Sequence, residues 1–187
     1  MNFASQKQNQ LLKSDKSSIG SWDKKILSLC EKINQQKNYY TTSSCGGRVV
    51  LLKSSPTKIE NAFLFRTHSL IKFPELKKAL LETGKKYNGA VEFQQTTCIL
   101  HVACLSSENA FSIVNKAKLA GWKRSGVMSG SRGRFVVELH STESMSFPIM
   151  NKGKILVDDN FLKIIVKEAN SKLKRTWEKI ERLEKLI

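Results

Sequence analysis

The sequence predicts an α+β fold: a duplicated helix-plus-strands unit forms a mixed or antiparallel sheet or barrel-like body, and a long helix ends the chain. Three observations support this. Apolar residues recur at helical spacing in some segments and alternate in others. Strands come in pairs and triplets, and no G-x-G-x-x-G follows a strand, which argues against a Rossmann fold. The order helix, strand, turn, strand, strand occurs twice, in residues 21–68 and 107–150.

The first half of the chain is predicted to form two helices separated by three strands. Strands are expected at 39–44, 48–53 and 62–67. Ser21 is a good N-cap for a first helix, whose stripe is Trp22, Ile26, Leu29, Cys30 and Ile33. Pro74 opens the second helix and Gly89 ends it; its stripe is Leu76, Ala79, Leu80, Thr83 and Tyr87.

The second half is predicted to continue with two tightly joined strands, at 90–95 and 98–105. Residues 122–141 are predicted to form two strands joined by a Gly/Ser turn, and residues 146–150 a further strand. Between these strands Ser107 caps a helix that Gly121 stops; its inward residues are predicted to be Ala110, Phe111, Val114 and Ala117.

The body is thus expected to span residues 21–158, followed by a helix over 159–187. The apolar stripe of that helix steps alternately by four and three residues and is interrupted by Thr176. This heptad spacing predicts a helix that packs partly on the body, projects from it, or pairs with another chain. Self-association through this helix, or a coiled-coil interaction module, is therefore one hypothesis.

Composition limits the compartment and the metal chemistry. Residues 1–20 are polar and mixed, which predicts a flexible lead-in without a signal peptide. No apolar run approaches the roughly 18 residues that span a membrane, so we expect a cytoplasmic protein without membrane partners. The four cysteines include no C-x-x-C pair, so reduced thiols and no metal site are expected.

The charge predicts anionic partners. The chain has 32 Lys and Arg against 16 Asp and Glu, a net charge of +16. No acidic residue lies between Glu108 and Glu138, and a second basic stretch runs from Arg66 to Lys86. The simplest explanation is that these basic residues lie on solvent-exposed faces and aid solubility. The surfaces of soluble proteins, however, usually mix positive and negative charges. Phosphates or anionic surfaces are the partners that this asymmetry favours.

The segment TTSSCGGR, residues 41–48, is either a simple turn or a site. Backbone N–H groups of a Gly/Ser turn form nests for anions, and Arg48 can fork onto a carboxylate or phosphate. Its counterpart in the second half is SGSRGR, which ends at Arg134. If the two halves are duplicates, equivalent turns lie at one end of a shared sheet, which brings Arg48 and Arg134 close together.

Single residues in these segments leave alternatives open. Cys45 is either a nucleophile or a small buried residue in a tight turn. His68 ends a strand, where functional histidines are more frequent, and His101 lies within an alternating strand. Trp122 either stacks on a base from within the basic stretch or closes the core beneath a helix end.

Taken together, the motifs resemble the tRNA wybutosine-synthesizing protein 3 family, over residues 21–170. Residues 42–48, Thr-Ser-Ser-Cys-Gly-Gly-Arg, are similar to the family's hallmark turn. Thr67-His68, Leu100-His101-Val102 and residues 121–126 resemble further family motifs in order. Later matches are Arg132-Gly133, Ser141-Thr142, Pro148 and Lys152-Gly153-Lys154. Gly46 stands where the family often has Ser or Ala.

The resemblance implies an enzyme of wybutosine biosynthesis. Members methylate the N-4 ring nitrogen of a tricyclic guanine derivative at position 37 of phenylalanine tRNA, in the anticodon loop. The implied methyl donor is S-adenosyl-L-methionine, and the implied fold is a duplicated, non-Rossmann α+β body. A non-catalytic RNA-binding protein, with basic patches and Gly/Ser phosphate nests, is the alternative function.

The resemblance also implies roles for particular residues. Catalytic roles fall to Ser43, Ser44, Cys45, His68 and His101, although an activated donor does not require a cysteine nucleophile. Donor binding is expected at Gly46, Gly47, Arg48, Trp122, Ser125 and Gly126. The tRNA backbone is expected to contact Lys123, Arg124, Arg132, Arg134, Lys152 and Lys154.

Overall fold

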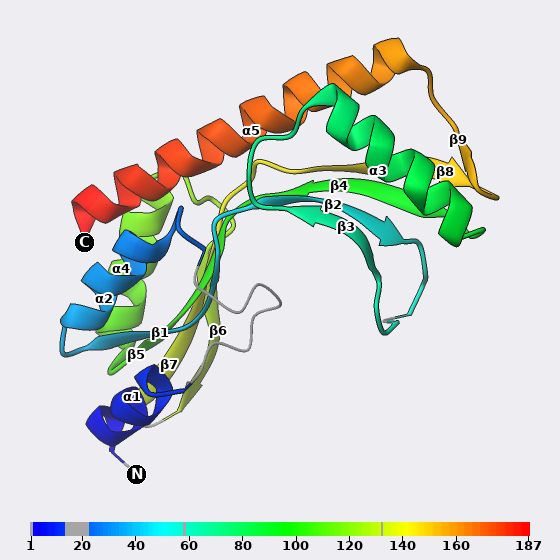
Figure 1. The fold of residues 1–187 in the computed structure, drawn as a ribbon. Helices are drawn as coiled ribbons and strands as arrows, with labels where there is room; N and C mark the ends of the chain where they lie inside the picture. Colours follow the sequence, from blue (N-terminus) through cyan, green and yellow to red (C-terminus); the bar gives the residue numbers. More distant parts are fainter. Residues whose placement is uncertain (1, 14–22, 58, 132) are drawn as a thin grey trace. The chain divides into compact units, whose positions relative to one another are not determined.

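The computed structural model describes the whole chain except residues 1, 14–22, 58 and 132 (Figure 1). The described chain divides into two compact units that interleave in sequence. Unit 1 comprises Met1–Gly46, Thr97–Thr142 and Thr176–Ile187, and unit 2 comprises Gly47–Thr96 and Glu143–Arg175. Both contain helices and a purely antiparallel sheet, so the predicted α+β class is confirmed.

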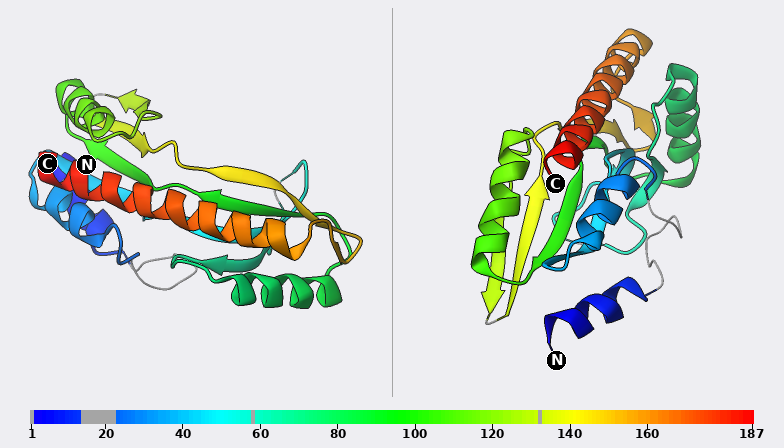
Figure 2. Two further views of the ribbon diagram at one scale, coloured as in Figure 1. Left: turned by 90° about the horizontal axis from the view of Figure 1, so that it is seen from above. Right: turned by 90° about the vertical axis from the view of Figure 1, so that its left-hand side faces the viewer.

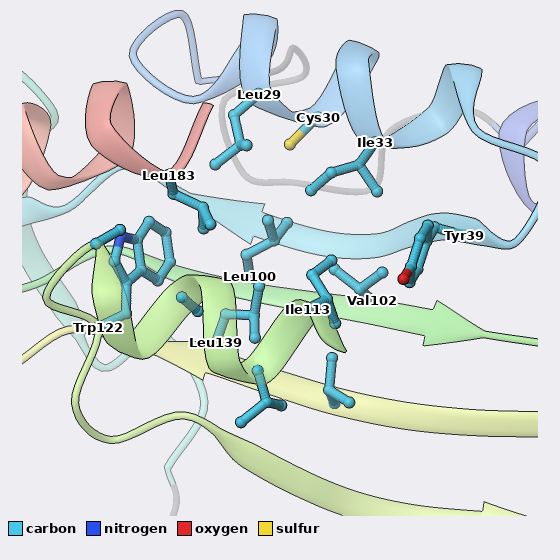
Figure 3. Packing of buried hydrophobic residues seen from close by; sticks show 14 of the residues in the cluster. Leu29, Cys30, Ile33, Tyr39, Leu100, Val102, Ile113, Trp122, Leu139 and Leu183 are labelled. Atoms are coloured by element: carbon cyan, nitrogen blue, oxygen red, sulfur yellow. The ribbon is translucent and has the colours of Figure 1, made fainter. Parts of the chain in front are cut away.

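Unit 1 contains a four-stranded sheet in the order β1-β5-β7-β6. Its strands are β1 (Tyr39–Cys45), β5 (Ile99–Cys104), β7 (Arg134–His140) and β6 (Gly126–Ser131). Helices α2 (Leu27–Gln35) and α4 (Ser107–Leu119) share one hydrophobic core with the sheet and the C-terminal residues Ile180 and Leu183. Figure 3 shows this core, with Trp122 packed near Leu183.

Helix α4 corrects two details of the prediction. Ser106, not Ser107, is the N-cap, and its side chain accepts a hydrogen bond from the backbone N–H of Asn109. Phe111 was expected to point inward but is 60% exposed, and Ile113 takes the inward position. The helical stripe is therefore rotated from the predicted one, because Ala110, Ile113, Val114 and Ala117 form the buried face.

The N-terminus contains a helix that the sequence did not predict. Helix α1 (Phe3–Leu11) is capped by Asn2, whose side chain accepts from the Ser5 N–H. Phe3 packs on Tyr40 and Ala103, and the Phe3 and Tyr40 ring centroids lie 5.1 Å apart. A single apolar anchor, which gives no periodic signal, holds this short polar helix. Residues 14–20 of the expected flexible lead-in, and the expected N-cap Ser21, lie outside the described residues.

Unit 2 contains a five-stranded sheet in the order β3-β2-β4-β8-β9. Its strands are β3 (Phe63–Thr67), β2 (Arg48–Lys53), β4 (Val91–Thr96), β8 (Met145–Asn151) and β9 (Lys154–Ile155), and helix α3 is Phe73–Lys86. An aromatic series joins this sheet to the last helix: the Phe93 and Phe147 centroids lie 5.3 Å apart, and those of Phe147 and Phe161 lie 6.0 Å apart.

Helix α5 (Asp159–Leu186) runs without a break, as Figures 1 and 2 show, and the unit boundary falls inside it. Its buried positions follow the predicted stripe, except that Ile165 is more buried than Val166: Leu162, Ile165, Ala169, Leu173, Thr176, Ile180 and Leu183. Thr176, the residue that interrupts the seam, hydrogen-bonds through its hydroxyl to the Thr97 hydroxyl at 3.3 Å. The stripe is thus buried within the chain, which removes the basis for the predicted self-association.

The predicted repeat has the right element order but not the expected strand pairing. Between Cys45 and Arg48 the chain leaves the four-stranded sheet and enters the five-stranded one, whereas β6 and β7 form a hairpin within one sheet. The strands β4 and β5, expected to be tightly joined, also belong to different sheets. The segment 41–48 is therefore a crossing between sheets, not the structural counterpart of the β6–β7 turn.

Candidate active site

A row of four residues crosses the four-stranded sheet of unit 1. The strand register places Ser43 on β1 opposite His101 on β5, His101 opposite Glu138 on β7, and Glu138 opposite Gly126 on β6. Directly paired residues point to the same face of a sheet. The strand neighbours of His101, Leu100 and Val102, point into the core, so the row lies on the other face. We call these four residues the cross-strand row.

Hydrogen bonds connect three members of the cross-strand row. The Ser43 Oγ lies 2.6 Å from His101 Nδ1, and His101 Nε2 lies 3.0 Å from Glu138 Oε2. A carboxylate only accepts, so the neutral imidazole carries its proton on Nε2 and Nδ1 accepts from the Ser43 hydroxyl. The His101 and Glu138 side chains are 24% and 33% exposed. This is the arrangement by which a serine hydroxyl passes a proton to a histidine that a carboxylate holds in place.

Gly126 ends the row beside Glu138 and leaves free space there. A Cβ atom built on Gly126 would have no heavy atom within 4 Å, and its φ is not in the left-handed region. The glycine is therefore required neither by its backbone conformation nor by close packing. Its effect is to leave open space next to Glu138.

Ser125 and Trp122 are structural in this fold. The Trp122 ring is fully buried, and its Nε1 donates to the Lys179 carbonyl at 3.0 Å. The Ser125 hydroxyl is buried, donates to the Trp122 carbonyl at 2.7 Å and accepts from the His140 N–H at 3.1 Å. Because the Trp122 ring has no exposed surface, the hypothesis that it stacks on a base or faces the donor is wrong. The alternative, that Trp122 closes the core beneath a helix end, is confirmed.

His140 lies two residues from Glu138 on the same face of β7. Burial lowers the pKa of its imidazole from 6.5; the Glu138 carboxylate opposes this shift, and Arg124 and His101 add to it. The folded chain thus holds the His140 proton less tightly than the unfolded chain does. His140 is a neutral neighbour of the cross-strand row near neutral pH.

This shift predicts a loss of stability in mild acid. Because the unfolded state binds the His140 proton more readily, the contribution to the free energy of unfolding is complete above about pH 6.5 and falls as the pH drops below that value. In His140→Gln the free energy of unfolding should fall less steeply between about pH 6.5 and about pH 5. Urea unfolding at several pH values measures both slopes, and equal slopes would contradict the assignment.

Gly46 is held by packing rather than left open for an anion. Its N–H donates to Asp23 Oδ2 at 2.7 Å, and its carbonyl accepts from Trp177 Nε1 at 3.1 Å. A Cβ atom at Gly46 would come within 2.9 Å of Asp23 Oδ2. The predicted Gly/Ser anion nest therefore does not include the Gly46 N–H, because a carboxylate already occupies it.

The four cysteines differ in burial. Burial raises the pKa of Cys30, Cys98 and Cys104 to about 12, and a hydrogen bond with Ser44 opposes the shift at Cys30. These three thiols lie in the core of unit 1. Cys45, at the end of β1, is partly exposed. Of the four, Cys45 is the one with access to solvent-borne reagents.

Iodoacetamide should therefore modify the native protein at Cys45 and spare Cys30, Cys98 and Cys104. All four thiols should react after unfolding in guanidinium chloride, because burial no longer suppresses the thiolate. Intact-mass measurement counts the labels before and after unfolding, and Cys45→Ser serves as the control that takes up none when folded. More than one label on the native chain would contradict this reading of the core.

The remaining predicted catalytic and donor-binding residues belong to unit 2. Gly47 has φ +97°, which only glycine adopts readily, and it starts the path into β2. The Arg48 guanidinium lies 4.9 Å from the Phe63 ring centroid, and its Nε is buried without a hydrogen-bond partner among the described residues. His68 directly follows β3, as predicted, so His68 and His101 lie in different units.

The predicted tRNA-binding residues are mostly exposed. Lys123 and Arg124 are exposed in the turn before β6, and Lys152 and Lys154 are exposed at the β8–β9 turn. Lys152 and Gly153 both have positive φ, as a two-residue hairpin turn of this type requires. Arg134 donates from Nε to the Tyr40 hydroxyl at 3.0 Å. Arg132 lies outside the described residues.

Glu138 is the site residue that sequence reasoning missed. It ends the acid-free stretch, and it alternates with His140 in the strand FVVELH, two signals that mark the exposed side of a strand. Neither signal pairs it with His101, which lies 37 residues away. Only the register between β5 and β7 does so.

Comparison with known proteins identifies the family. A model of the methyltransferase TYW3 family matches residues 4–187. The chain belongs to this family. The match extends the resemblance read from the sequence in both directions, to include α1 and the end of α5. None of the helices formed by described residues is long and apolar enough to cross a membrane.

Curated relatives and a solved structure agree with the family. A Thermococcus sibiricus protein named tRNA(Phe) 7-((3-amino-3-carboxypropyl)-4-demethylwyosine(37)-N(4))-methyltransferase is 38% identical over 88% of this chain and 83% of its own length. A Xenopus laevis tRNA wybutosine-synthesizing protein 3 homolog is 32% identical over 99% of this chain and 74% of its own length. The structure of the PH1069 protein from Pyrococcus horikoshii superposes with a TM-score of 0.85 at 33% identity, covering 98% of this chain and 93% of that one.

Proposed function

We propose that this member of the TYW3 family methylates N4 of the 4-demethylwyosine derivative at position 37 of tRNA(Phe), with S-adenosyl-L-methionine as donor. Family membership supports methyl transfer to tRNA. The names of the archaeal relatives state the methylated nitrogen, N4, and the tRNA position, 37. They also name a substrate that already carries the 3-amino-3-carboxypropyl chain. We keep the cytoplasm as the expected compartment.

One observation carries the chemistry: His101 is held between the Ser43 hydroxyl and the Glu138 carboxylate. When the new N–C bond forms at the ring nitrogen, the nitrogen must lose its proton. The Ser43 oxygen accepts that proton while its own passes to His101 Nδ1, and Glu138 stabilises the resulting imidazolium. Three side chains of one sheet thus accept the proton that leaves the ring nitrogen and stabilise the positive charge that it brings.

When bound, S-adenosyl-L-methionine supplies an electrophilic methyl group on a sulfonium, so the protein mainly aligns the two reactants. Gly126 fits such a ligand, because it leaves open space beside Glu138. Arg48 fits an anionic group, either the donor carboxylate or an RNA phosphate, since its Nε has no partner among the described residues. Gly47 stays a proposed donor-binding residue, whereas Trp122 and Ser125 lie in the core of unit 1.

The tRNA backbone is proposed to contact Lys123, Arg124, Arg132, Arg134, Lys152 and Lys154. Exposed lysine and arginine side chains on two turns suit phosphates, and neutralising them releases counterions. Binding of the anticodon loop should therefore weaken steeply with salt. His68, Ser44 and Cys45 remain proposed catalytic contributors, and His101 and Ser43 take priority because the hydrogen bonds between them and to Glu138 are described.

The decisive experiment supplies the purified chain with labelled S-adenosyl-L-methionine and two forms of tRNA(Phe), with and without the 3-amino-3-carboxypropyl chain. We expect one methyl group on the position-37 nucleoside of the first form, assigned to N4 by mass spectrometry. Donor binding without transfer to either form would contradict the proposal. Tight tRNA binding without any donor binding would instead favour the non-catalytic RNA-binding alternative, which no comparison supports.

A further inference from the structure

A hollow of about 580 Å³ lies in unit 2, at the edge strand β3. Its walls include Leu52, Ser54, Phe63, Glu92 and Gln94. Phe63, Glu92 and Gln94 point to the same face of the five-stranded sheet, because Phe63 and Glu92 both oppose Leu52, and Gln94 opposes Val50. The hollow is within the size range of small-ligand sites.

Phe63, which lines the hollow, is an exposed aromatic residue with two cations beside its ring. Phe63 is 43% exposed. The Arg48 and Arg66 guanidinium carbons lie 4.9 and 5.2 Å from its ring centroid, so two positive charges share one aromatic side chain. The buried Arg48 Nε has no hydrogen-bond partner among the described residues. An anion at this rim would supply one and would offset the repulsion between the guanidinium groups.

A second lining residue, Glu92, presents an organised carboxylate. Glu92 accepts hydrogen bonds from Ser54 Oγ at 3.0 Å, Gln94 Nε2 at 2.9 Å and Ser146 Oγ at 3.4 Å. These bonds lower the pKa of Glu92, which keeps the group an acceptor at neutral pH. A fixed acceptor and an aromatic ring in one lining suit a flat ligand with N–H donors at its edge, and nucleobases have this chemistry.

We propose that this hollow binds an unpaired nucleobase of the RNA substrate, from a nucleotide other than the one that is methylated. The base stacks on Phe63 and presents its N–H edge to Glu92, and its phosphates contact Arg48 and Arg66. Loop nucleotides can be splayed out and stacked in this way, whereas paired bases cannot. The inference rests on the proposed function, because it assigns a second contact to the same tRNA.

The test compares Phe63→Ala and Phe63→Leu with the wild-type chain, using an anticodon stem-loop of tRNA(Phe) in fluorescence anisotropy. Loss of the stacking ring should weaken RNA binding about 5- to 100-fold in both variants, while donor affinity by calorimetry stays within about twofold. Phe111→Ala, which removes a still more exposed phenylalanine from α4 in unit 1, should change neither value.

Stem-loops with one abasic nucleotide at each loop position locate the partner base. At one loop position, removing the base should weaken binding to the wild-type chain as much as Phe63→Ala weakens binding of the intact loop. Phe63→Ala should then bind that abasic loop with no further loss of affinity. Arg66→Ala should reduce the salt slope of binding by about one phosphate contact, whereas Arg182→Ala on the exposed face of α5 should not.

Two results would overturn the inference. In the first, both Phe63 variants bind the stem-loop within twofold of wild type. In the second, both lose donor affinity instead, which would assign the hollow to the adenine of the methyl donor. Neither result affects the proposed function, because methyl transfer by the wild-type chain is measured independently.

Discussion

His101→Ala should lower the rate of methyl transfer by about 10²- to 10⁴-fold in single-turnover assays, with donor affinity within about twofold of wild type. The physical reason is that His101 is the group to which Ser43 passes the proton that leaves the ring nitrogen. Ser43→Ala removes the point of proton entry and should reach a similar loss. Glu138→Gln keeps a hydrogen-bond acceptor for His101 but loses the charge, so its loss should be smaller, about 10-fold.

The double variant Ser43→Ala/His101→Ala should be no slower than His101→Ala alone, because residues of one relay are non-additive. His140→Gln is the matched control: it removes a histidine from the same face of the same sheet, outside the Ser43–His101–Glu138 hydrogen bonds. Additive losses in the double variant, or an equal loss in His140→Gln, would show that no relay operates. His68→Ala in the same assay decides whether the second predicted histidine contributes.

Gly126→Val should lower kcat/KM for methyl transfer by at least about 100-fold without lowering the melting temperature. A valine side chain suits an edge strand, and its Cβ atom would have no heavy atom within 4 Å, so the fold should tolerate it. The same side chain fills the open space beside Glu138, where the reactants are proposed to lie. Thermal unfolding and steady-state kinetics separate the two effects.

Gly130→Ala on the same strand is the matched control with the opposite expectation. A Cβ atom there would come within 2.5 Å of the Phe135 ring, so this variant should lose stability but keep its activity at low temperature. If Gly126→Val methylates tRNA at a rate near wild type, ligands do not use the space beside Glu138, and the reaction must take place on another part of the chain.

Local sequence patterns predicted the elements well. Helix α5, predicted from its heptad stripe, begins at the expected Asp159 and ends one residue before the expected Ile187. Strands β1, β2 and β3 lie within a residue of their expected bounds. These features depend on the spacing of apolar side chains and on turn residues, which neighbours in the sequence determine. The motifs around Ser43, His68 and His101 were likewise enough to indicate the family.

The pairing of strands that are distant in the sequence could not be predicted from local patterns. The order of β1 and β2 along the chain suggests a hairpin, yet they join different sheets. Helix α1 was missed because Phe3 anchors it on Tyr40, a contact without any periodic signal. Trp122 looked equally suited to base stacking and to packing, and only the core around it decides between them.

By itself, the sequence determined that this is a basic α+β protein with the ordered motifs of a tRNA-modifying family, and that Ser43 and His101 are candidates for its chemistry. Tertiary structure alone decided that these two side chains meet, that Glu138 completes the relay, and that Gly126 leaves space beside it. The reason is that strand register is set by the packing of whole sheets against helices. Four residues on four strands become neighbours only when that register forms.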